Sequence, residues 1–369
     1  MKKILFLIHD LGQGGAEKVL VNLVNNIDRN KFDVSVIALF GGGINEQFLN
    51  PDIHFRTIWK KEVRGNRKLM KLLSPQQLHK KCVKEQFDIE ISYLEGPSAR
   101  VISGCTDKTI KLVSWIHVEQ HTMRKLASAF RSEKEARECY SRFDQTVCVS
   151  QNVHDDFCRI LDFQKSCRVL YNTVESEKIL AVAAEPVLGL EDDGKVRLIA
   201  VGTLKKSKGY MRLLRIIKRL KDEKYGVHLY ILGVGPLEQE MKDYINQHEL
   251  HEEVTLLGYQ TNPYKYVSKC DLLVCSSFAE GFSTAVTEAL IVGTPVCTVA
   301  VSGMKELLGE HNEYGVVTEN NEEALFKGVK KLLDDIDLLT FYRNKAKIRG
   351  NTFKTENTVK AVEEMLLKL

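Results

Sequence analysis

The sequence predicts an α/β protein with two Rossmann-like, doubly wound domains. The chain has 369 residues, which is more than one hydrophobic core usually organises, so two domains are expected. Apolar runs of strand length alternate with helical patterns, and this order is typical of βαβ units. The predicted strands are continuous apolar runs rather than alternations, which indicates parallel sheets covered by helices on both faces.

The first domain is predicted to span residues 1–172. Its first strand is expected at 2–8 (KKILFLI), followed by a helix whose apolar residues recur at helical spacing. The first strand meets His9 and Asp10 after a short apolar run, so a retained strand is expected there and not a signal peptide. Further strands are predicted at 33–39, 87–94, 110–117, 145–150 and 167–172.

Residues 173–195 interrupt this rhythm with mixed charge, small residues, Pro186 and Gly194, and they are predicted to connect the domains. The βα pattern then restarts in a second domain over 196–350. The strands expected there span 196–202, 227–233, 254–258, 271–277 and 294–300. Residues 351–369 read as an amphipathic helix, which we expect to pack back on the first domain.

Composition excludes several classes of protein. With 44% hydrophobic and 28% charged residues, the chain is typical of a soluble globular protein, and no apolar run approaches the roughly 18 residues of a membrane span. The 9 cysteines form no CxxC pair and no His/Cys metal spacing. Reduced thiols in a cytoplasmic protein are therefore expected, with neither a metal site nor a disulfide framework.

Basic charge is concentrated in the first domain. Residues 1–172 hold 27 Lys and Arg against 20 Asp and Glu, whereas the remainder is acidic. Between Arg56 and Lys84, ten basic residues stand against one acid, Glu62. Two interpretations stay open: a solvated surface segment, or a patch for an anionic lipid surface, a lipid-diphosphate carrier or a charged glycan. No nucleic-acid module accompanies the charge, so nucleic acid is not expected as a partner.

Ligands of doubly wound folds bind at the carboxyl ends of strands, and two such domains face to face would place a site in the cleft between them. Gly14 and Gly15 open the first helix and offer free N–H groups to an anion, although a structural turn is the open alternative. A dinucleotide fingerprint would need glycine at Glu17 and an acid near Phe40. NAD binding is therefore not expected.

Three further segments place polar residues just after predicted strands. His117 ends one strand, where it could bind a sugar hydroxyl or be a satisfied structural residue. Lys205, Lys206 and Lys208 lie in a turn before a helix, which suits a phosphate as well as an ordinary exposed turn. Gly235 is a candidate donor-binding residue in a glycine turn before a helix, although a glycine turn and a proline at a helix start are also ordinary structural signals.

Two carboxylates flank the start of a predicted apolar helix in AEGFSTAVTEAL (279–290). Ser283 or Thr284 is a natural N-cap, but Glu288 is too far along the helix to complete a capping box. Glu280 precedes the helix and Glu288 lies beside its apolar face, so both are expected to border one crevice. Carboxylates there can accept hydrogen bonds from vicinal hydroxyls, while the helix N-terminus can hold a phosphate.

These segments together resemble the family 4 retaining glycosyltransferases, which have the two-domain GT-B fold. The resemblance runs nearly end to end, and its most specific part is the E-x7-E motif. The segments that carry it are GGAEKVLVNL, SWIH, VSQNV, LYNTVE, VGTLKKSKG, LGVGPLEQEM, VTLLGY and EGFSTAVTEALIVGTPV. The other segments are individually unspecific but occur in the family's order.

The resemblance implies roles for particular residues. Glu280 would bind the transferred sugar and Glu288 the ribose, while Lys208 and Gly15 would lie at the diphosphate and His117 near the donor sugar. Gly281, Phe282, Ser283 and Thr284 would offer backbone N–H groups to the sugar and the diphosphate. The region of Tyr259 would contact the base, mainly through its backbone. The family usually carries arginine where this chain has Thr203, so one fixed cation is missing, and a lysine is a poorer bidentate clamp.

The expected activity is retaining transfer of a hexose or N-acetylhexosamine from a nucleotide diphosphate sugar, with UDP favoured. The acceptor would be a glycan or lipid-linked saccharide in cell-surface polysaccharide synthesis. No cofactor or metal is expected. The protein is expected to be cytoplasmic, with peripheral contact to the inner membrane face through 56–84. Two alternatives remain: a nucleotide-sugar epimerase of the same fold, and a non-catalytic nucleotide-sugar-binding subunit.

Overall fold

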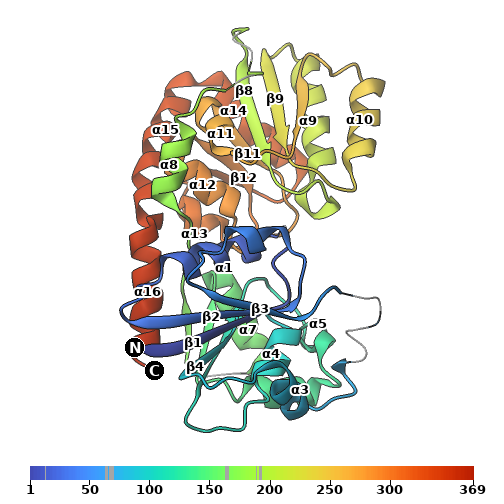
Figure 1. The fold of residues 1–369 in the computed structure, drawn as a ribbon. Helices are drawn as coiled ribbons and strands as arrows, with labels where there is room; N and C mark the ends of the chain where they lie inside the picture. Colours follow the sequence, from blue (N-terminus) through green and yellow to red (C-terminus); the bar gives the residue numbers. More distant parts are fainter. Residues whose placement is uncertain (13, 63–64, 66–69, 163–165, 188, 191–192) are drawn as a thin grey trace. The chain divides into compact units, whose positions relative to one another are not determined.

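The computed structural model describes all residues except 13, 63–64, 66–69, 163–165, 188 and 191–192. The chain folds into two units, each with its own parallel sheet (Figure 1). Unit 1 comprises Met1–Val174 and Thr355–Leu369, and unit 2 comprises Glu175–Lys354. The α/β fold class and the two parallel sheets predicted from the sequence are confirmed.

The sheet of unit 1 has seven strands in the order β3-β2-β1-β4-β5-β6-β7, and every neighbouring pair is parallel. The order reverses between β1 and β4, as in a doubly wound sheet. The strands are β1 (Lys2–Ile8), β2 (Phe32–Phe40), β3 (His54–Trp59), β4 (Ile89–Ser92), β5 (Lys111–Ile116), β6 (Gln145–Cys148) and β7 (Cys167–Val169).

Helices cover both faces of this sheet, with α1 on one side and α3 and α4 on the other (Figure 1). They are α1 (Gly15–Asn26), α3 (Pro75–Cys82), α4 (Pro97–Ile102), α5 (Met123–Leu126), α6 (Glu133–Tyr140), α7 (Gln151–Leu161) and α16 (Thr355–Leu367), with 3₁₀ turns η1 (Ile44–Phe48) and η2 (Ala127–Ala129). The last helix, α16, belongs to unit 1: Glu363 accepts from Lys31 Nζ at 2.8 Å, and Lys2 Nζ donates to the carbonyl of Leu366.

The sheet of unit 2 has six parallel strands in the order β10-β9-β8-β11-β12-β13 and reverses between β8 and β11. The strands are β8 (Val196–Val201), β9 (Val227–Leu232), β10 (Val254–Gly258), β11 (Leu272–Cys275), β12 (Val296–Val299) and β13 (Val316–Thr318). Helices and 3₁₀ turns connect them: α8 (Ser176–Ala183), η3 (Lys206–Lys208), α9 (Tyr210–Asp222), α10 (Glu238–Gln247), α11 (Tyr264–Lys269), α12 (Thr284–Val292), α13 (Met304–Leu308), α14 (Glu322–Asp334), α15 (Ile336–Gly350) and η4 (Asn351–Phe353).

The sequence pattern predicted most strands, including the edge strands β7 and β10. The other two edge strands, β3 and β13, were not predicted, because both lack a long apolar run. The segment 173–195, expected as a connection, contains helix α8, which packs on α11 and α12 within unit 2. The segment 56–84 also contains regular structure, since β3 and α3 cover its two ends; residues 63–64 and 66–69 of it lie outside the described residues.

Candidate active site

A crevice in unit 2 opens at the carboxyl ends of β8 and β11, where the strand order reverses. Ligands of doubly wound sheets bind at such reversals. Lys208, Tyr210, Ser277, Glu280 and Ser283 are among the residues that line it. The sequence-predicted residues Lys208, Glu280 and Ser283 therefore come together, although up to 75 positions separate them in the chain.

The central contact of this crevice is an ion pair between Lys208 and Glu280. Lys208 Nζ lies 2.6 Å from Glu280 Oε1, and the two side chains are 24% and 12% exposed. Ser277 donates its hydroxyl to the same carboxylate oxygen at 2.6 Å. An ammonium and a carboxylate are thus held side by side, close enough to the surface to exchange their mutual contact for a ligand that carries both phosphate and hydroxyl groups.

Arg212 fixes the backbone that carries Glu280, and the sequence analysis did not single it out. Its guanidinium is 3% exposed and donates to the carbonyls of Ser276 and Ser277 at 2.7 and 2.9 Å. It also donates to Asn320 Oδ1 and lies over the ring of Phe278. In the sequence, Arg212 stands out only as an arginine on the apolar face of a predicted helix. That position does not indicate which distant loop the side chain binds.

The turn that carries Lys208 approaches the same loop closely. Gly209 has a φ of +69°, and a Cβ there would lie 1.9 Å from the carbonyl oxygen of Ser276. The hydroxyl of Ser276 in turn donates to the carbonyl of Lys208 at 3.0 Å. Only glycine fits at this point, so the close approach holds the turn of Lys208 against the loop of Glu280.

Ser283 and Glu288 have clear structural positions in the first turns of α12. Ser283 is the N-cap and accepts from the backbone N–H of Val286. Glu288, one turn into the helix, is 7% exposed and accepts a hydrogen bond from the Tyr264 hydroxyl at 3.3 Å. Its carboxylate is not among the described residues that line the crevice of Lys208 and Glu280. The expectation that both acids border one crevice thus stays a prediction.

The other residues at the start of α12 differ in what they expose. Gly281 and Phe282 are buried, and the Phe282 ring packs edge-on against Phe353, so the Phe282 side chain is occupied by core packing. Thr284 is half-buried at the first position of the helix. This placement fits the expected use of backbone N–H groups rather than side chains.

The strand ends that flank the crevice carry exposed groups. Thr203 directly follows Gly202 after β8 and is exposed, as are Lys205 and Lys206. Tyr259, which follows β10, is 52% exposed. Packing alone requires glycine at position 235, because a Cβ there would lie within 2.5 Å of the Leu204 carbonyl oxygen. The glycine therefore lets two strand-end loops pack closely, whether or not a nucleotide contacts it.

In unit 1, the N-terminus of α1 lies at the carboxyl end of β1. Gly14 is the N-cap and Gly15 the first helical residue, and both are exposed. Gly14 has no side chain to cap this end, and the Glu17 carboxylate of the first turn lies against it, since a Cβ on Gly14 would meet Glu17 Oε2 at 1.9 Å. The expected role of the glycine pair at a diphosphate stays a prediction.

His117 follows β5 in unit 1 and is neutral. It is 6% exposed, its ring packs against Tyr93, and burial lowers its pKa to about 3. Its Nε2 is buried without a hydrogen-bond partner among the described residues. A neutral imidazole with a spare nitrogen can exchange a hydrogen bond with a hydroxyl, which is one of the two roles considered for His117 above, and it carries no positive charge.

Glu95, which follows β4, is a second residue that the sequence analysis missed. Its carboxylate accepts the backbone N–H of His117 at 3.0 Å and the side-chain amide of Gln120 at 3.2 Å. Burial raises the pKa of Glu95 above its ordinary value, against the opposing effect of these hydrogen bonds. An acid at the end of β4 and a histidine at the end of β5 thus form a second polar site, next to the reversal between β1 and β4.

Comparison with known proteins identifies the class. The model for Glycosyltransferase Family 4 matches residues 13–178, and that for Glycosyl transferases group 1 matches residues 186–349. A Campylobacter jejuni protein, N-acetylgalactosamine-N,N'-diacetylbacillosaminyl-diphospho-undecaprenol 4-alpha-N-acetylgalactosaminyltransferase, is 32% identical over 370 residues, which are 96% of either chain. The chain therefore belongs to the family 4, group 1 glycosyltransferases, and it is a glycosyltransferase.

Solved structures share the fold. HepE of Anabaena in complex with UDP superposes with a TM-score of 0.80 at 19% identity, over 100% of both chains. The lipopolysaccharide outer core galactosyltransferase WaaB does so with a TM-score of 0.71 at 17% identity, again over 100% of both chains. The predicted GT-B fold is confirmed.

Proposed function

We propose that the protein transfers an N-acetylhexosamine or hexose from a UDP-sugar to a lipid-linked saccharide, with retention at the anomeric carbon and without a metal. The product would be an intermediate of a bacterial cell-surface polysaccharide such as a capsule. The observation that carries the proposal is the Lys208–Glu280 pair, held by Arg212 at the strand reversal of unit 2.

The pair supports a donor with a diphosphate next to a sugar. Lys208 would exchange Glu280 for the diphosphate, and the released carboxylate would accept hydroxyl hydrogens of the sugar. UDP is favoured because HepE of Anabaena is described with UDP and with UDP-glucose bound. The exposed Lys205 and Lys206 would supply further positive charge where Thr203 replaces the expected arginine.

Lipid-linked acceptors are suggested by the relatives. The relative described above is named for an undecaprenol diphosphate saccharide. A second Campylobacter jejuni protein is named GalNAc-alpha-(1->4)-GalNAc-alpha-(1->3)-diNAcBac-PP-undecaprenol alpha-1,4-N-acetyl-D-galactosaminyltransferase and is 25% identical over 380 residues, which are 100% of this chain and 98% of the relative. Both names specify an N-acetylhexosamine as the transferred sugar, which favours that class here.

The proposed chemistry needs no enzymatic nucleophile. The bond from the anomeric carbon to the diphosphate oxygen breaks, the acceptor oxygen bonds to the same face of that carbon, and the acceptor proton passes to the departing phosphate oxygen. Lys208 and the free N–H groups at the start of α12 would stabilise the charge that grows on the leaving group. These fixed charges would take the part that a divalent cation plays elsewhere.

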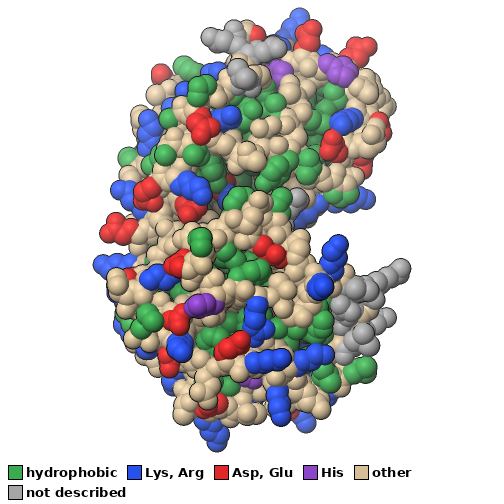
Figure 2. All heavy atoms as spheres, viewed as in Figure 1, with side chains coloured by type: hydrophobic (Ala, Val, Ile, Leu, Met, Phe, Trp, Pro, Cys, Tyr) green, Lys and Arg blue, Asp and Glu red, His purple; other side chains and the backbone are tan. Residues whose placement is uncertain are grey.

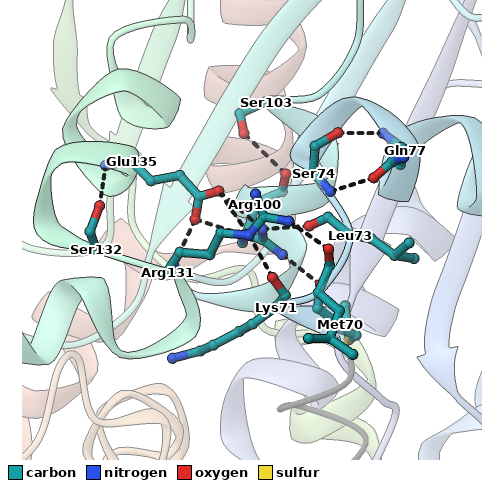
Figure 3. Close-up of polar contacts among 11 residues, drawn as sticks. Met70, Lys71, Leu73, Ser74, Gln77, Arg100, Ser103, Arg131, Ser132 and Glu135 are labelled. Carbon is teal, nitrogen blue, oxygen red and sulfur yellow. Dashed lines mark hydrogen bonds and ion pairs between the residues drawn. The ribbon is translucent and has the colours of Figure 1, made fainter.

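A basic face of unit 1 supports peripheral contact with an anionic membrane. Lys and Arg side chains gather over α3 and α5 (Figure 2). Beside them, Arg100 and Arg131 bind the backbone carbonyls of residues 70–73, as Figure 3 shows. This anchoring leaves the side chain of Leu72 74% exposed, so an apolar group projects next to positive charge. Among the described residues, no helix is long and apolar enough to cross a membrane.

A ligand screen tests the donor. Thermal unfolding is measured with UDP, GDP, ADP and their sugar conjugates, and we expect UDP and one UDP-N-acetylhexosamine to raise the Tm by mass action. Transfer to an undecaprenyl-diphosphate saccharide is then followed with that donor, in the presence and absence of EDTA, and the anomeric configuration of the product is read by NMR. Inversion, or a loss of activity in EDTA that Mg²⁺ or Mn²⁺ restores, would contradict the corresponding part of the proposal.

The same assay separates the two alternatives. A nucleotide-sugar epimerase would convert the donor with no acceptor present. A non-catalytic binding subunit would show the Tm shift but no transfer to any acceptor. Either result would replace the proposed transfer reaction.

Vesicle co-sedimentation tests the membrane contact. We expect binding to vesicles with anionic lipid, weaker binding as salt is raised, and weaker binding of Leu72→Glu. Leu180→Glu is the matched control, because Leu180 is an exposed leucine (52%) in unit 2. Equal sedimentation with neutral and anionic vesicles would contradict the contact.

A further inference from the structure

Glu90 places a carboxylate in the middle of the unit 1 core. It lies on β4, next to Leu5 of β1 and Leu112 of β5, and it is 0% exposed. A fully buried carboxylate requires a partner of positive charge, because burial alone costs several kcal/mol. The Glu90 carboxylate is not part of the polar site formed by Glu95 and His117 at the strand ends. Its partner in the core therefore needs a separate explanation.

Two further side chains converge on Glu90. His79 Nε2 lies 2.7 Å from Glu90 Oε2, and the thiol of Cys105 completes a group whose ligand atoms all lie within 4.8 Å of one another. Cys105 is 1% exposed. The second carboxylate oxygen, Glu90 Oε1, is buried and has no hydrogen-bond partner among the described residues. One imidazole, one thiol and one carboxylate with a spare oxygen thus face one small volume.

Three separate elements bring these residues together. His79 lies in the last turn of α3, Glu90 on β4, and Cys105 in the segment after α4. Gly104 allows that segment to approach α3, since a Cβ there would lie 1.9 Å from the Pro75 carbonyl oxygen. Arg142 then fixes the segment by donating to the carbonyls of Ser103 and Cys105. The backbone segments that carry the three side chains are therefore held in place by packing and hydrogen bonds without an ion.

We infer that His79, Glu90 and Cys105 bind a zinc ion. Thiolate, imidazole and carboxylate are the three protein ligand types of zinc, and three protein ligands leave a fourth position for water. With a thiolate and a carboxylate, the ligands carry two negative charges, which the cation neutralises in the core. The ion would tie α3 to β4 and to the segment after α4, so its role would be structural.

A proton is the competing occupant. Burial lowers the pKa of His79, but hydrogen bonds to Cys105 and Glu90 outweigh this effect and raise the pKa to about 9. A protonated His79 would then satisfy the carboxylate with no metal. The two occupants differ in metal content, so a metal measurement distinguishes them.

The test is metal content and cobalt spectroscopy on the full chain. Protein purified without chelators or a metal-affinity tag is expected to hold one equivalent of zinc by mass spectrometry. After removal of zinc, one equivalent of Co²⁺ should produce a thiolate-to-cobalt charge-transfer band, and zinc should raise the Tm. Cys105→Ala should lose the band, the retained zinc and the Tm shift together.

Two further variants keep the result interpretable. Cys82→Ala is the matched control, because Cys82 is an equally buried thiol of α3 outside the cluster, and it should retain one equivalent of zinc. If Cys105→Ala does not fold, Glu90→Gln preserves the shape of the side chain and should still weaken zinc binding by at least about tenfold. Wild-type protein with no zinc and no thiolate–cobalt band would overturn the inference and assign the cluster to the proton.

Discussion

The carboxyl ends of the two sheets carry side chains of different electrostatic kinds. In unit 2, Lys208 and Glu280 are charged, paired and partly exposed. In unit 1, His117 is buried and neutral, and Glu95 beside it has a raised pKa. The same doubly wound topology therefore carries a charged pair of side chains in one unit and a buried, neutral imidazole in the other. The difference teaches that the fold supplies the position of a site and the side chains decide its ligand.

The largest expected effect comes from removing the cation of unit 2. Lys208→Ala should lower kcat/KM for the sugar donor by about 100- to 1000-fold, because the growing charge of the leaving group loses its fixed partner. Steady-state transfer kinetics measure it. Lys327→Ala is the control, since Lys327 is a 72% exposed lysine of the same unit, on α14, with no proposed role at the donor site. If both variants lose activity equally, general positive charge and not the Lys208–Glu280 pair serves the donor.

The neutral state of His117 predicts a pH dependence of stability. Its pKa is about 3 in the folded protein against an ordinary value of 6.5, so between these values the unfolded chain binds the extra proton. Stability should therefore fall as pH drops through this window, by roughly 3 kcal/mol at pH 4. His117→Gln should lack this loss. Both tryptophans, Trp59 and Trp115, lie in unit 1, so urea unfolding followed by tryptophan fluorescence reports that unit.

The control for this comparison is His54→Gln, because the His54 side chain is 73% exposed. That variant should keep the wild-type difference in unfolding free energy between pH 7 and pH 4. An unchanged pH dependence in His117→Gln would mean that the histidine titrates normally and that the site of unit 1 is not neutral.

A smaller loss is expected from Glu280→Gln. The amide keeps the shape of the side chain but accepts hydroxyl hydrogens without negative charge, so kcat/KM should fall by about 10- to 100-fold. Transfer kinetics with the preferred donor measure the effect. Glu310→Gln, at a 68% exposed carboxylate of the same unit, should remain within error of the wild type. Full activity of Glu280→Gln would remove this carboxylate from the proposed sugar contact.

The smallest effect, and a gain, is expected at Thr203. Thr203→Arg should restore a bidentate cation after β8 and raise kcat/KM by about 3- to 10-fold. Thr203→Gln has a long polar side chain without charge and should not show the gain. A loss of activity in Thr203→Arg would indicate that Lys205 or Lys206 already occupies the position, which would sharpen the account of the diphosphate site.

The sequence alone was sufficient for most of the fold, and it singled out Lys208, Glu280 and Ser283, which the structure brings together at one crevice. Strands β1 and β9 follow their apolar runs closely, because parallel strands buried on both faces are continuous hydrophobic segments. The edge strands β3 (HFRTIW) and β13 (VVT) escaped prediction, because neither contains an apolar run of ordinary strand length. The resemblance to the family assigned Lys208 and Glu280 to one donor site; the structure pairs the two side chains, and their role at a donor stays a prediction.

Tertiary structure alone determined which of these residues contact one another. It also determined the ionisation state of the buried groups. Hydrophobic periodicity in the sequence does not predict that Arg212 binds the loop of Glu280. It also does not predict that His79, Glu90 and Cys105 lie together in one buried volume. Parallel strands bring segments from distant parts of the chain to one edge, and the burial found there sets the charge. The sequence by itself determined the elements and their chemical groups, while packing determined the contacts and the pKa values, because both depend on neighbours far away in the chain.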